Sequence, residues 1–420
     1  MNGTIIIVAY AVNPYKGSED GTGWNWIKQA SASNNIIAIT RKNNQADIER
    51  YQSKNEPIGA EFRYYDLPKW ARFWKRGPKG AMPYYLLWQA FLPIFIQQNI
   101  KDYHIIHHLN FHNDWTPTFG WTLGKPVVWG PIGHHSKIPK QFILPFYGKK
   151  AYVKDRMTSL VKNYFWKIDP LLKISRTKAK AILKINSAAV TAADKENRHS
   201  FLCPAIACKK MEVTEIKSEK FLALTVGRFV PLKGMDVSIR SFAKFVKSLP
   251  ENKRKQACLK IVGKGPCKSQ LAELIRAENM QDNIEIIEWM AREDLLKLFQ
   301  RCSLFLFPSH EGAGMVVMEA MAAGLPVLCF DNDGPGELVN EECAIKIPYG
   351  EYEETIEKFS SALKKLFSNR GMLKQMSTAA IEYQASHHSW EERGELLAKV
   401  YNRILQNERK NQSTLFPLPE

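Results

Sequence analysis

The stretch LFLFPSHEGAGMVVMEAMAAGLPVLCF, residues 304–330, decides the fold class of this chain. Its first four residues are apolar and predict a buried strand. A loop with Gly312 and Gly314 follows, and a helix is expected to start near Met315. A second apolar run comes after the helix. A strand, a glycine-rich loop, a helix and another strand are typical of one unit of a parallel α/β sheet.

The same alternation recurs along the whole chain. We expect strands at 5–10, 36–40, 105–108, 126–129, 222–226, 259–262, 284–287, 304–307 and 326–329. The loop that follows the first strand is expected to lead into a helix that opens at Trp24. The length of 420 residues favours two domains. The prediction is an α/β fold with two doubly wound, Rossmann-like domains facing each other across a cleft, where ligands would bind at the carboxyl ends of the strands.

The expected boundaries follow from breaks in this pattern. A first domain should cover residues 1–205 and a second one residues 206–385, because Cys203-Pro204 and a polar segment interrupt the alternation. A closing helix over 386–410 is expected to cross back to the first domain.

Composition excludes several classes of protein. A charged fraction of 24% and a hydrophobic fraction of 45% exclude a disordered or fibrous chain and a polytopic membrane protein. The seven cysteines include no Cys-x-x-Cys pair, which argues against a disulfide scaffold or a zinc site and favours a reducing compartment. The first residues lead directly into an apolar strand without a basic segment, so we expect no secretory signal.

Positive charge is concentrated in the first half of the chain. Residues 1–210 hold 31 Lys and Arg against 13 Asp and Glu, whereas residues 211–420 hold 28 against 29. The segments 62–79 and 137–184 carry most of the excess, and the first of them interleaves it with aromatic residues. An anionic bilayer surface, single-stranded nucleic acid and a merely solvated basic face are all compatible with this pattern.

The apolar run 81–96 directly follows the first basic segment. It is 16 residues long and contains Pro83 and Pro93. Because a spanning helix needs about 17–25 apolar residues, a buried or interfacial helix is favoured over a transmembrane one.

A second motif, VGRFVPLKG at residues 226–234, also follows a predicted strand. Arg228 and Lys233 should therefore reach the same sheet edge as the glycine-rich loop. A guanidinium fork and an ammonium group suit a pyrophosphate, and the free N–H groups of a new helix suit an anion. Glu311 and Glu319, eight positions apart, could both point at one bound molecule and accept hydrogen bonds from sugar hydroxyls.

Together these motifs resemble family 4 glycosyltransferases of the GT-B fold, which are retaining enzymes that use nucleotide sugars. The resemblance implies that Arg228 and Lys233 hold the diphosphate, that Glu319 holds the ribose hydroxyls and that Glu311 contacts the transferred sugar. The backbone at Met290 would meet the base. The donor would also contact the loop and first helical turn formed by Gly312, Ala313, Gly314 and Met315.

The first half resembles a branch of this family that acts in bacterial surface polysaccharide synthesis. The similar blocks are PYKGSE followed by GW at 14–24, HHLNF at 107–111 and VWGPIG at 128–133. The resemblance implies that Gly17 approaches the donor phosphate and that Glu19 contacts sugar or acceptor. It also places a functional histidine at the end of the third strand, for which His108 is the first choice and His107 the second. His134 and His135 replace the glycines that such relatives carry, and His134 is a candidate acceptor contact.

A metal site is not expected. His104, His107 and His108 lie in a predicted strand, which sends alternate side chains to opposite faces. Asp331 and Asp333 form an Asp-x-Asp pair outside the donor motifs, and the family resemblance implies a metal-independent enzyme. Arg228 and Lys233 would supply the positive charge at the phosphate, so no cofactor is expected beyond the nucleotide sugar.

The resulting functional hypothesis is a hexosyltransferase-type enzyme. It would transfer sugar from a UDP- or GDP-sugar to a glycan or lipid-linked glycan, with retention, in the cytoplasm at the inner membrane surface. An anionic membrane is an expected partner and nucleic acid is not. Two alternatives stay open: a GT-B sugar-nucleotide epimerase and a non-enzymatic polyanion or nucleic-acid binding protein.

Overall fold

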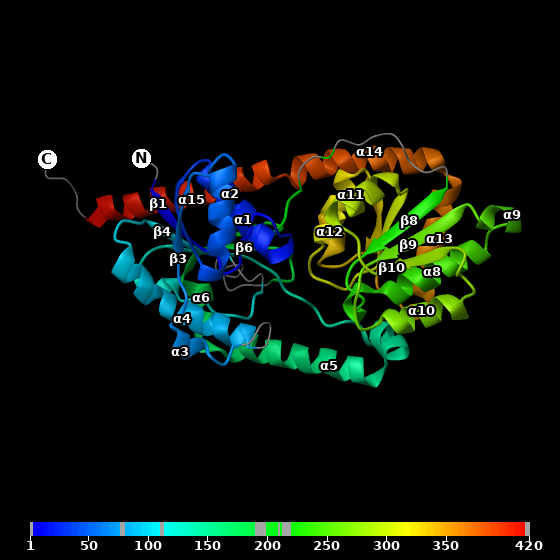
Figure 1. Cartoon of the computed structure of the whole chain (residues 1–420), viewed down its shortest axis with the longest axis horizontal. Coiled ribbons are helices and arrows are strands. Elements are labelled where there is room, and N and C mark those ends of the chain that lie inside the picture. Colours follow the sequence, from blue (N-terminus) through cyan, green and yellow to red (C-terminus); the bar gives the residue numbers. More distant parts are fainter. Residues whose placement is uncertain are drawn as a thin grey trace. The chain divides into compact units, whose positions relative to one another are not determined.

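The computed structural model describes residues 3–75, 80–109, 113–189, 199–208, 211 and 220–415. The chain divides into two compact units (Figure 1). Unit 1 comprises Met1–His134, Val161–Ile206 and Trp390–Glu420, and unit 2 comprises His135–Leu160 and Ala207–Ser389. Each unit is built around one sheet whose strands are all parallel.

The sheet of unit 1 has the strand order β3-β2-β1-β4-β5-β6-β7. Its strands are β1 (Thr4–Val8), β2 (Asn35–Thr40), β3 (Ala60–Tyr64), β4 (Ile105–His108), β5 (Val127–Ile132), β6 (Ala179–Lys184) and β7 (His199–Leu202). The chain order reverses between β1 and β4. In doubly wound sheets such a switch point is where ligands bind, beyond the carboxyl ends of the strands.

Helices cover both faces of this sheet. Unit 1 contains α1 (Ser18–Ser31), η1 (Lys42–Asn44), α2 (Gln45–Lys54), α3 (Lys69–Arg72), α4 (Ala81–Asn99), η2 (Gly120–Leu123), α6 (Pro170–Lys178) and α15 (Trp390–Leu415). The α4 helix packs its buried side on the face of the sheet that includes Ile106. The next residue, His107, points to the opposite face, as alternation along a strand requires, and contacts Tyr401 of α15. The α15 helix also packs against α1 (Figure 1).

The first helix starts earlier than the sequence predicts. It begins at Ser18, with Gly17 at its N-cap, and not at Trp24. Gly21 and Gly23, which the sequence analysis assigned to the preceding loop, lie inside this helix. A Cβ on Gly23 would meet the carbonyl oxygen of Ala11 at 2.2 Å. The absence of a side chain therefore lets α1 lie directly against the loop that follows β1.

The sheet of unit 2 has the strand order β10-β9-β8-β11-β12-β13. Its strands are β8 (Phe221–Val226), β9 (Ala257–Val262), β10 (Ile284–Ile287), β11 (Leu304–Phe307), β12 (Val327–Phe330) and β13 (Ala344–Ile347). Strands β8 and β11 are neighbours at the switch point, and both sequence motifs follow their carboxyl ends. The predicted fold class of two Rossmann-like α/β domains is confirmed.

The helices of unit 2 form a layer on each face of its sheet (Figure 1). They are η3 (Pro231–Lys233), α8 (Met235–Lys247), α9 (Glu251–Arg254), α10 (Lys268–Ala277), α11 (Arg292–Arg301), α12 (Met315–Ala322), η4 (Pro335–Leu338), α13 (Tyr352–Ser368) and α14 (Arg370–His387). The α8, α10 and α13 helices pack with the sheet into one large apolar core. The α12 helix contacts both α11 and α14.

Residues His135–Leu160 belong to unit 2, although the sequence analysis placed them in a first domain over 1–205. The reason is packing at the start of α5 (Lys140–Ile168), where Phe142 and Tyr147 enter the core of unit 2. The Tyr147 hydroxyl donates a hydrogen bond of 2.8 Å to the fully buried carboxylate of Asp236. Residues from Trp390 onward belong to unit 1.

The uncharged run after residue 80 forms α4. Over the described residues, no helix combines the length and the apolar character that a membrane crossing demands.

Candidate functional site

Two loops of unit 2 contact each other at the carboxyl edge of the sheet. One is formed by residues 227–234 after β8 and the other by residues 308–314 after β11. The backbone N–H of His310 donates to the carbonyl oxygen of Leu232 at 2.8 Å. Gly234 has φ of 60°, and a Cβ there would lie 1.9 Å from the carbonyl oxygen of Pro308. Only glycine permits this approach, so the two motifs are held together although about 80 positions separate them.

The loop pair brings Lys233 and Glu311 into direct contact. The Lys233 Nζ atom lies 2.5 Å from Glu311 Oε1, and both side chains are about 85% buried (14% and 15% exposed). The ammonium group also lies 5.0 Å from the centre of the Phe307 ring. Gly227 gives the lysine its room, because a Cβ at that position would approach the Lys233 stem at 3.1 Å. Two residues that the sequence analysis chose for catalysis are therefore neighbours.

Arg228 lies on the same loop and is exposed. No ion pair of its guanidinium is found within the described part of the chain. Its charge is therefore available to an anion that approaches this edge of the sheet.

Glu319 has a different cationic partner. It lies in α12, is 7% exposed, and its Oε1 atom accepts a hydrogen bond of 2.6 Å from Arg292. Arg292 is the first residue of α11, which follows the loop with Met290 and the exposed Trp289. Sequence analysis missed Arg292, since an arginine at the start of an ordinary helix carries no motif.

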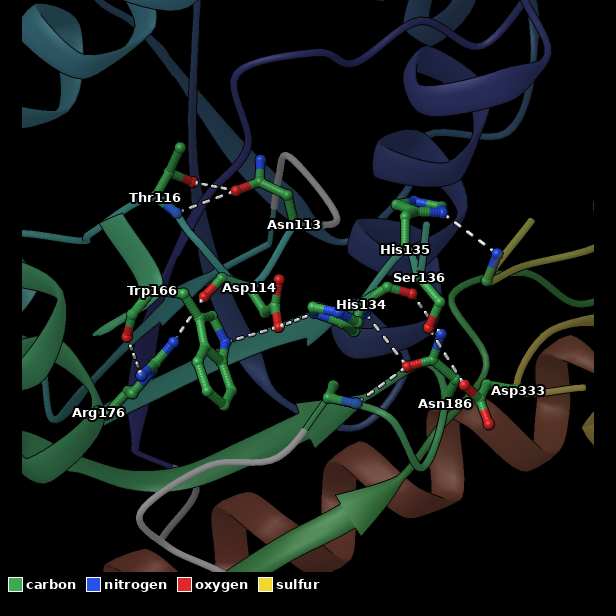
Figure 2. Close-up of polar contacts among 12 residues, drawn as sticks. Asn113, Asp114, Thr116, His134, His135, Ser136, Trp166, Arg176, Asn186 and Asp333 are labelled. Atoms are coloured by element: carbon green, nitrogen blue, oxygen red, sulfur yellow. Dashed lines mark hydrogen bonds and ion pairs between the residues drawn. The ribbon is translucent and has the colours of Figure 1, made fainter. Parts of the chain in front are cut away.

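The predicted anion site at α12 has the expected local geometry. The helix runs from Met315 to Ala322 with Gly314 at its N-cap, and the first N–H groups of a helix have no partner inside it. The N–H of Gly312 donates to the Nδ1 atom of His135 at 3.2 Å (Figure 2). That amide is therefore engaged within unit 2, whereas Ala313 is partly exposed.

A cavity of about 290 Å³ in unit 2 adjoins this loop pair. Glu311 and Gly312 line it together with His310, the Asp331–Asp333 segment and residues 136–139. The Ser136 hydroxyl donates to Asp333 at 3.4 Å (Figure 2). A Cβ on Gly334 would lie 1.8 Å from the carbonyl oxygen of Glu311, so a glycine is required where the loop after β12 meets this glutamate. The cavity is small, and most of the residues that line it have polar side chains, among them the carboxylates of Glu311, Asp331 and Asp333. Such a lining suits a hydroxylated ligand.

His310 forms part of the cavity wall and was quoted in the sequence motif without a role. Its Nδ1 atom lies 2.9 Å from the Tyr349 hydroxyl, and its ring stacks on Phe330 and Tyr349. Burial lowers the pKa of His310 to about 3, so the imidazole is neutral at neutral pH. Its Nε2 atom has no partner among the residues that the structure describes. A bound hydroxyl group is a suitable partner for that nitrogen.

The adjacent histidines of β4 are both buried in unit 1. His107 uses both ring nitrogens, with Tyr401 Oη at 2.6 Å and the carbonyl oxygen of Gly130 at 2.7 Å. Burial lowers its pKa to about 4, an effect that the Gly130 carbonyl partly offsets. The engaged nitrogens argue against His107 as an acceptor contact.

His108 is 3% exposed and packs against Gly120, where a Cβ would lie 2.6 Å from His108 Nε2. Burial lowers its pKa to about 3, with a smaller contribution from His107. Neither ring nitrogen has a partner among the described residues. Asn110 and Phe111, which complete the sequence block, lie outside those residues. The catalytic role of His108 stays a prediction.

His134 has a supporting network that the sequence analysis did not foresee (Figure 2). Its Nδ1 atom lies 2.9 Å from Asp114 Oδ2, which also accepts a 2.9 Å hydrogen bond from the indole N–H of Trp166. Asp114 is 3% exposed. The Nδ2 group of Asn186 donates to the His134 carbonyl oxygen at 2.8 Å. Because the Asp114 carboxylate accepts a hydrogen bond from Nδ1 of His134, this nitrogen carries a proton and Nε2 is free to accept one. The His134 side chain is a quarter exposed.

Arg176 completes this network from α6. Its guanidinium donates to the carbonyl oxygens of Asp114 (3.1 Å) and Trp166 (3.0 Å) and lies 4.7 Å from the Trp166 ring centre. Asp114 follows β4 as His134 follows β5, and these strands are neighbours. That relation is the signal that could have found Asp114.

Gly17 and Glu19 lie at the start of α1 in unit 1. Gly17 is exposed at the N-cap, and Glu19 lies in the first turn. The structure places them at the carboxyl edge of their sheet, and their donor and acceptor contacts stay predictions. Among the residues that the structure describes, no group of three or more His, Cys, Asp or Glu could hold a metal ion.

Comparison with known families gives a match that lies within unit 2. Residues 208–383 match the family model described as "Glycosyl transferases group 1". This segment, less than half of the chain, contains both loop motifs. Residues 208–383 are therefore similar to a glycosyltransferase group 1 domain.

Curated relatives share a similar stretch. A GDP-mannose-dependent monoacylated alpha-(1-6)-phosphatidylinositol monomannoside mannosyltransferase from Corynebacterium glutamicum is 27% identical over 181 residues, which is 41% of this chain and 45% of the relative. The chain spans less than half the length of each of the first curated relatives that it matches.

Solved structures are similar over almost the whole chain. WaaG, a glycosyltransferase involved in lipopolysaccharide biosynthesis, has a TM-score of 0.58 at 16% identity and covers 94% of this chain and 99% of its own. HepE from Anabaena in complex with UDP has a TM-score of 0.58 at 14% identity and covers 95% and 100%. At these identities the likeness shows the fold, which is the GT-B fold.

Proposed function

We propose that this protein is a retaining, metal-independent glycosyltransferase. It would transfer a sugar from a nucleoside-diphosphate sugar to a glycan or lipid-linked glycan in cell-surface polysaccharide synthesis. The single observation that carries this proposal is the loop pair of unit 2, where Lys233 and Glu311 meet beside a polar cavity at the start of α12. The family match of this segment supports the same reading.

The residues of the loop pair would bind the donor in parts. Lys233 and the exposed Arg228 supply positive charge for a diphosphate, and the first N–H groups of α12 supply hydrogen-bond donors for it. Glu319, oriented by Arg292, would accept hydrogen bonds from the ribose hydroxyls. Glu311 and His310 line the cavity that would take the sugar. Met290 follows β10 and would lie near the base.

The chemical step would depend on stabilising the leaving group. As the bond between the anomeric carbon and the phosphate oxygen lengthens, negative charge grows on the diphosphate, and cations fixed in place stabilise that charge more in the transition state than in the bound donor. The departing phosphate oxygen would take the proton of the acceptor hydroxyl on the same face, which retains the anomeric configuration. His134, held by Asp114, is the unit 1 side chain whose Nε2 could hold a hydroxyl group.

The nucleotide is proposed as UDP or GDP. HepE is described in complex with UDP, and the corynebacterial relative is described as GDP-mannose-dependent. WaaG is described as acting in lipopolysaccharide biosynthesis, which supports the surface polysaccharide role. We also propose that the protein works in the cytoplasm, in contact with an anionic face of the inner membrane, because its first half is strongly basic.

A donor screen tests this function without knowledge of the acceptor. Thermal melting of the full chain is measured with UDP, GDP and ADP, and the sugar nucleotides of whichever base binds are then tested for slow release of nucleoside diphosphate. A ligand at 100 times its Kd adds about 2.7 kcal/mol to the stability of the fold that binds it, which is a readily measured shift. We expect one base to shift the melting temperature and Lys233→Met to reduce sugar release from it. No shift with any nucleotide would refute the proposed function.

A further inference from the structure

Unit 1 contains an apolar pocket of about 490 Å³ that no residue of the proposed reaction lines. Its wall includes Leu87 and Ala90 from α4, Trp115 from the loop after β4, and Tyr164 and Ile168 from the end of α5. This volume lies in the range of about 300–1,000 Å³ in which proteins enclose small ligands. The only acidic side chain in the wall is Asp169, and its carboxylate caps α6 by accepting the N–H of Leu171 at 2.9 Å.

The rim of this pocket is apolar on both helices. Leu87, Phe91 and Ile94 are exposed on α4, at positions i, i+4 and i+7 of one helical face, and the whole of α4 lacks a charged residue. On α5, Tyr164 and Ile168 are 59% and 62% exposed. An exposed helix face without charge is unusual for a surface in contact with water, and a contiguous patch of this kind marks a binding surface.

Positive charge is concentrated on the segment that forms one side of this pocket. Between Val161 and Lys184 the chain has seven Lys or Arg and one acid, Asp169. Lys167 and Lys173, on α5 and α6, are exposed on the helices that form one side of the pocket. A hydrocarbon-lined cavity next to ammonium groups is complementary to a molecule with an apolar chain and an anionic head.

We propose that this pocket takes one acyl chain of an anionic phospholipid, with Lys167 and Lys173 at its phosphate. The proposal rests on the membrane contact in the proposed function and goes beyond it. A basic surface is attracted to any anionic bilayer, whereas a pocket binds a single lipid molecule. Phe91 and Ile94 would enter the bilayer beside the bound chain, so that the lipid anchors unit 1 through α4 and the end of α5.

The test uses the full chain and a lipid that is monomeric in water, dihexanoyl phosphatidylglycerol. Binding is followed by calorimetry, with dihexanoyl phosphatidylcholine as the uncharged-head comparison. Ala90→Phe fills the pocket and should weaken binding of the phosphatidylglycerol at least tenfold. Ile94→Ser is the matched control, since Ile94 is exposed on the same helix but does not line the pocket, and it should bind the monomeric lipid as the unaltered chain does.

The charge part of the proposal has its own variant. Replacing both Lys167 and Lys173 by Gln should remove most of the preference for phosphatidylglycerol over phosphatidylcholine. Vesicles of phosphatidylglycerol and phosphatidylcholine should then float with the unaltered protein and much less with Ala90→Phe. If Ala90→Phe does not fold, Leu87→Asn, at an exposed position of the wall, gives the same comparison.

Three results would overturn the proposal. They are equal lipid affinity in Ala90→Phe and the unaltered chain, equal affinity for the two head groups, and a concentration-dependent dimer that Ala90→Phe abolishes. The last would show that a second copy covers the surface. The increase in the melting temperature of the protein caused by bound nucleotide is measured on the same variants, and it should equal that of the unaltered chain. If the protein binds the lipid but no nucleotide changes its melting temperature, the proposed transferase function is refuted and the lipid pocket is still supported.

Discussion

Replacing Lys233 by Met tests whether this ammonium group stabilises the leaving diphosphate. Because Lys233 is about 85% buried, an effective dielectric constant near 20 applies, and a unit charge about 4 Å from a phosphate oxygen contributes about 4 kcal/mol. Loss of one such preorganised group typically lowers kcat by about 10²–10³, or about 2.7–4 kcal/mol. We expect this loss in the release of nucleoside diphosphate from the donor, measured under single-turnover conditions.

The contact with Glu311 gives a rival explanation, which a double-mutant cycle separates. If Lys233 served only to neutralise Glu311, then Lys233→Met combined with Glu311→Gln would be no worse than Glu311→Gln alone. A lysine that acts on the diphosphate predicts a further large loss in the double variant. Lys247→Met is the matched control, since Lys247 also contacts a glutamate, Glu278 at 2.6 Å, away from both loops, and its activity should be unchanged. Recovery of activity in the double variant would refute the reasoning.

Three further predictions concern the surroundings of the site and the fold. Arg292→Gln should raise the Kd of the bound nucleotide two- to fivefold by calorimetry. The reason is that the Arg292 side chain is 61% exposed, so that water screens its charge and its pair with Glu319 contributes at most about 1 kcal/mol. An unchanged Kd would remove Arg292 from the site. Tyr352→Phe deletes a 3.0 Å hydrogen bond to the buried carboxylate of Asp236 and should cost about 1.5–3 kcal/mol in urea unfolding of the chain, while an unaltered midpoint would count against that bond. The pKa of His107 is near 6.5 in the unfolded chain, and burial lowers it to about 4 in the folded protein. Between these two values the unfolded chain binds more protons than the folded protein does. The free energy of unfolding should therefore decrease as the pH drops from about 6.5 to about 4. At pH 5 the loss from this residue is about 2 kcal/mol relative to pH 7.5, and His107→Gln should make the urea midpoint less sensitive to pH.

The sequence predicts the sheet well where strands are buried on both faces. The β11 and β12 strands are continuous apolar runs, and β8 contains a single polar residue, the buried Thr225. Such runs predict buried strands of a parallel sheet. The β3 and β6 strands were missed because Glu61 and Lys180 point to water and break the pattern. The start of α1 was misplaced because its glycines serve close packing and not a loop.

Site residues can be predicted where they follow strands whose carboxyl ends lie at the same edge of the sheet. Lys233 and Glu311 follow neighbouring strands, so their proximity could be expected from topology alone. Asp114 could have been found by the same rule, because it follows β4 as His134 follows the neighbouring β5. Arg292 could not be chosen in advance, because its salt bridge depends on side-chain directions that no spacing rule supplies. The sequence left open whether His108 is a functional or a buried core histidine, because a histidine at the end of a strand is compatible with both.

The division of the chain at 134, 160, 206 and 389 has a consequence for biosynthesis. Unit 1 needs α15, which follows all of unit 2 in the sequence, to cover α1 and to complete the hydrogen bond between Tyr401 and His107. Unit 2 is complete once residue 389 has emerged, even though unit 1 begins first. We therefore expect the amino-terminal sheet to remain incomplete until α15 has been synthesised. A stop codon that removes α15 should destabilise the strands of unit 1, which lie far from it in the sequence.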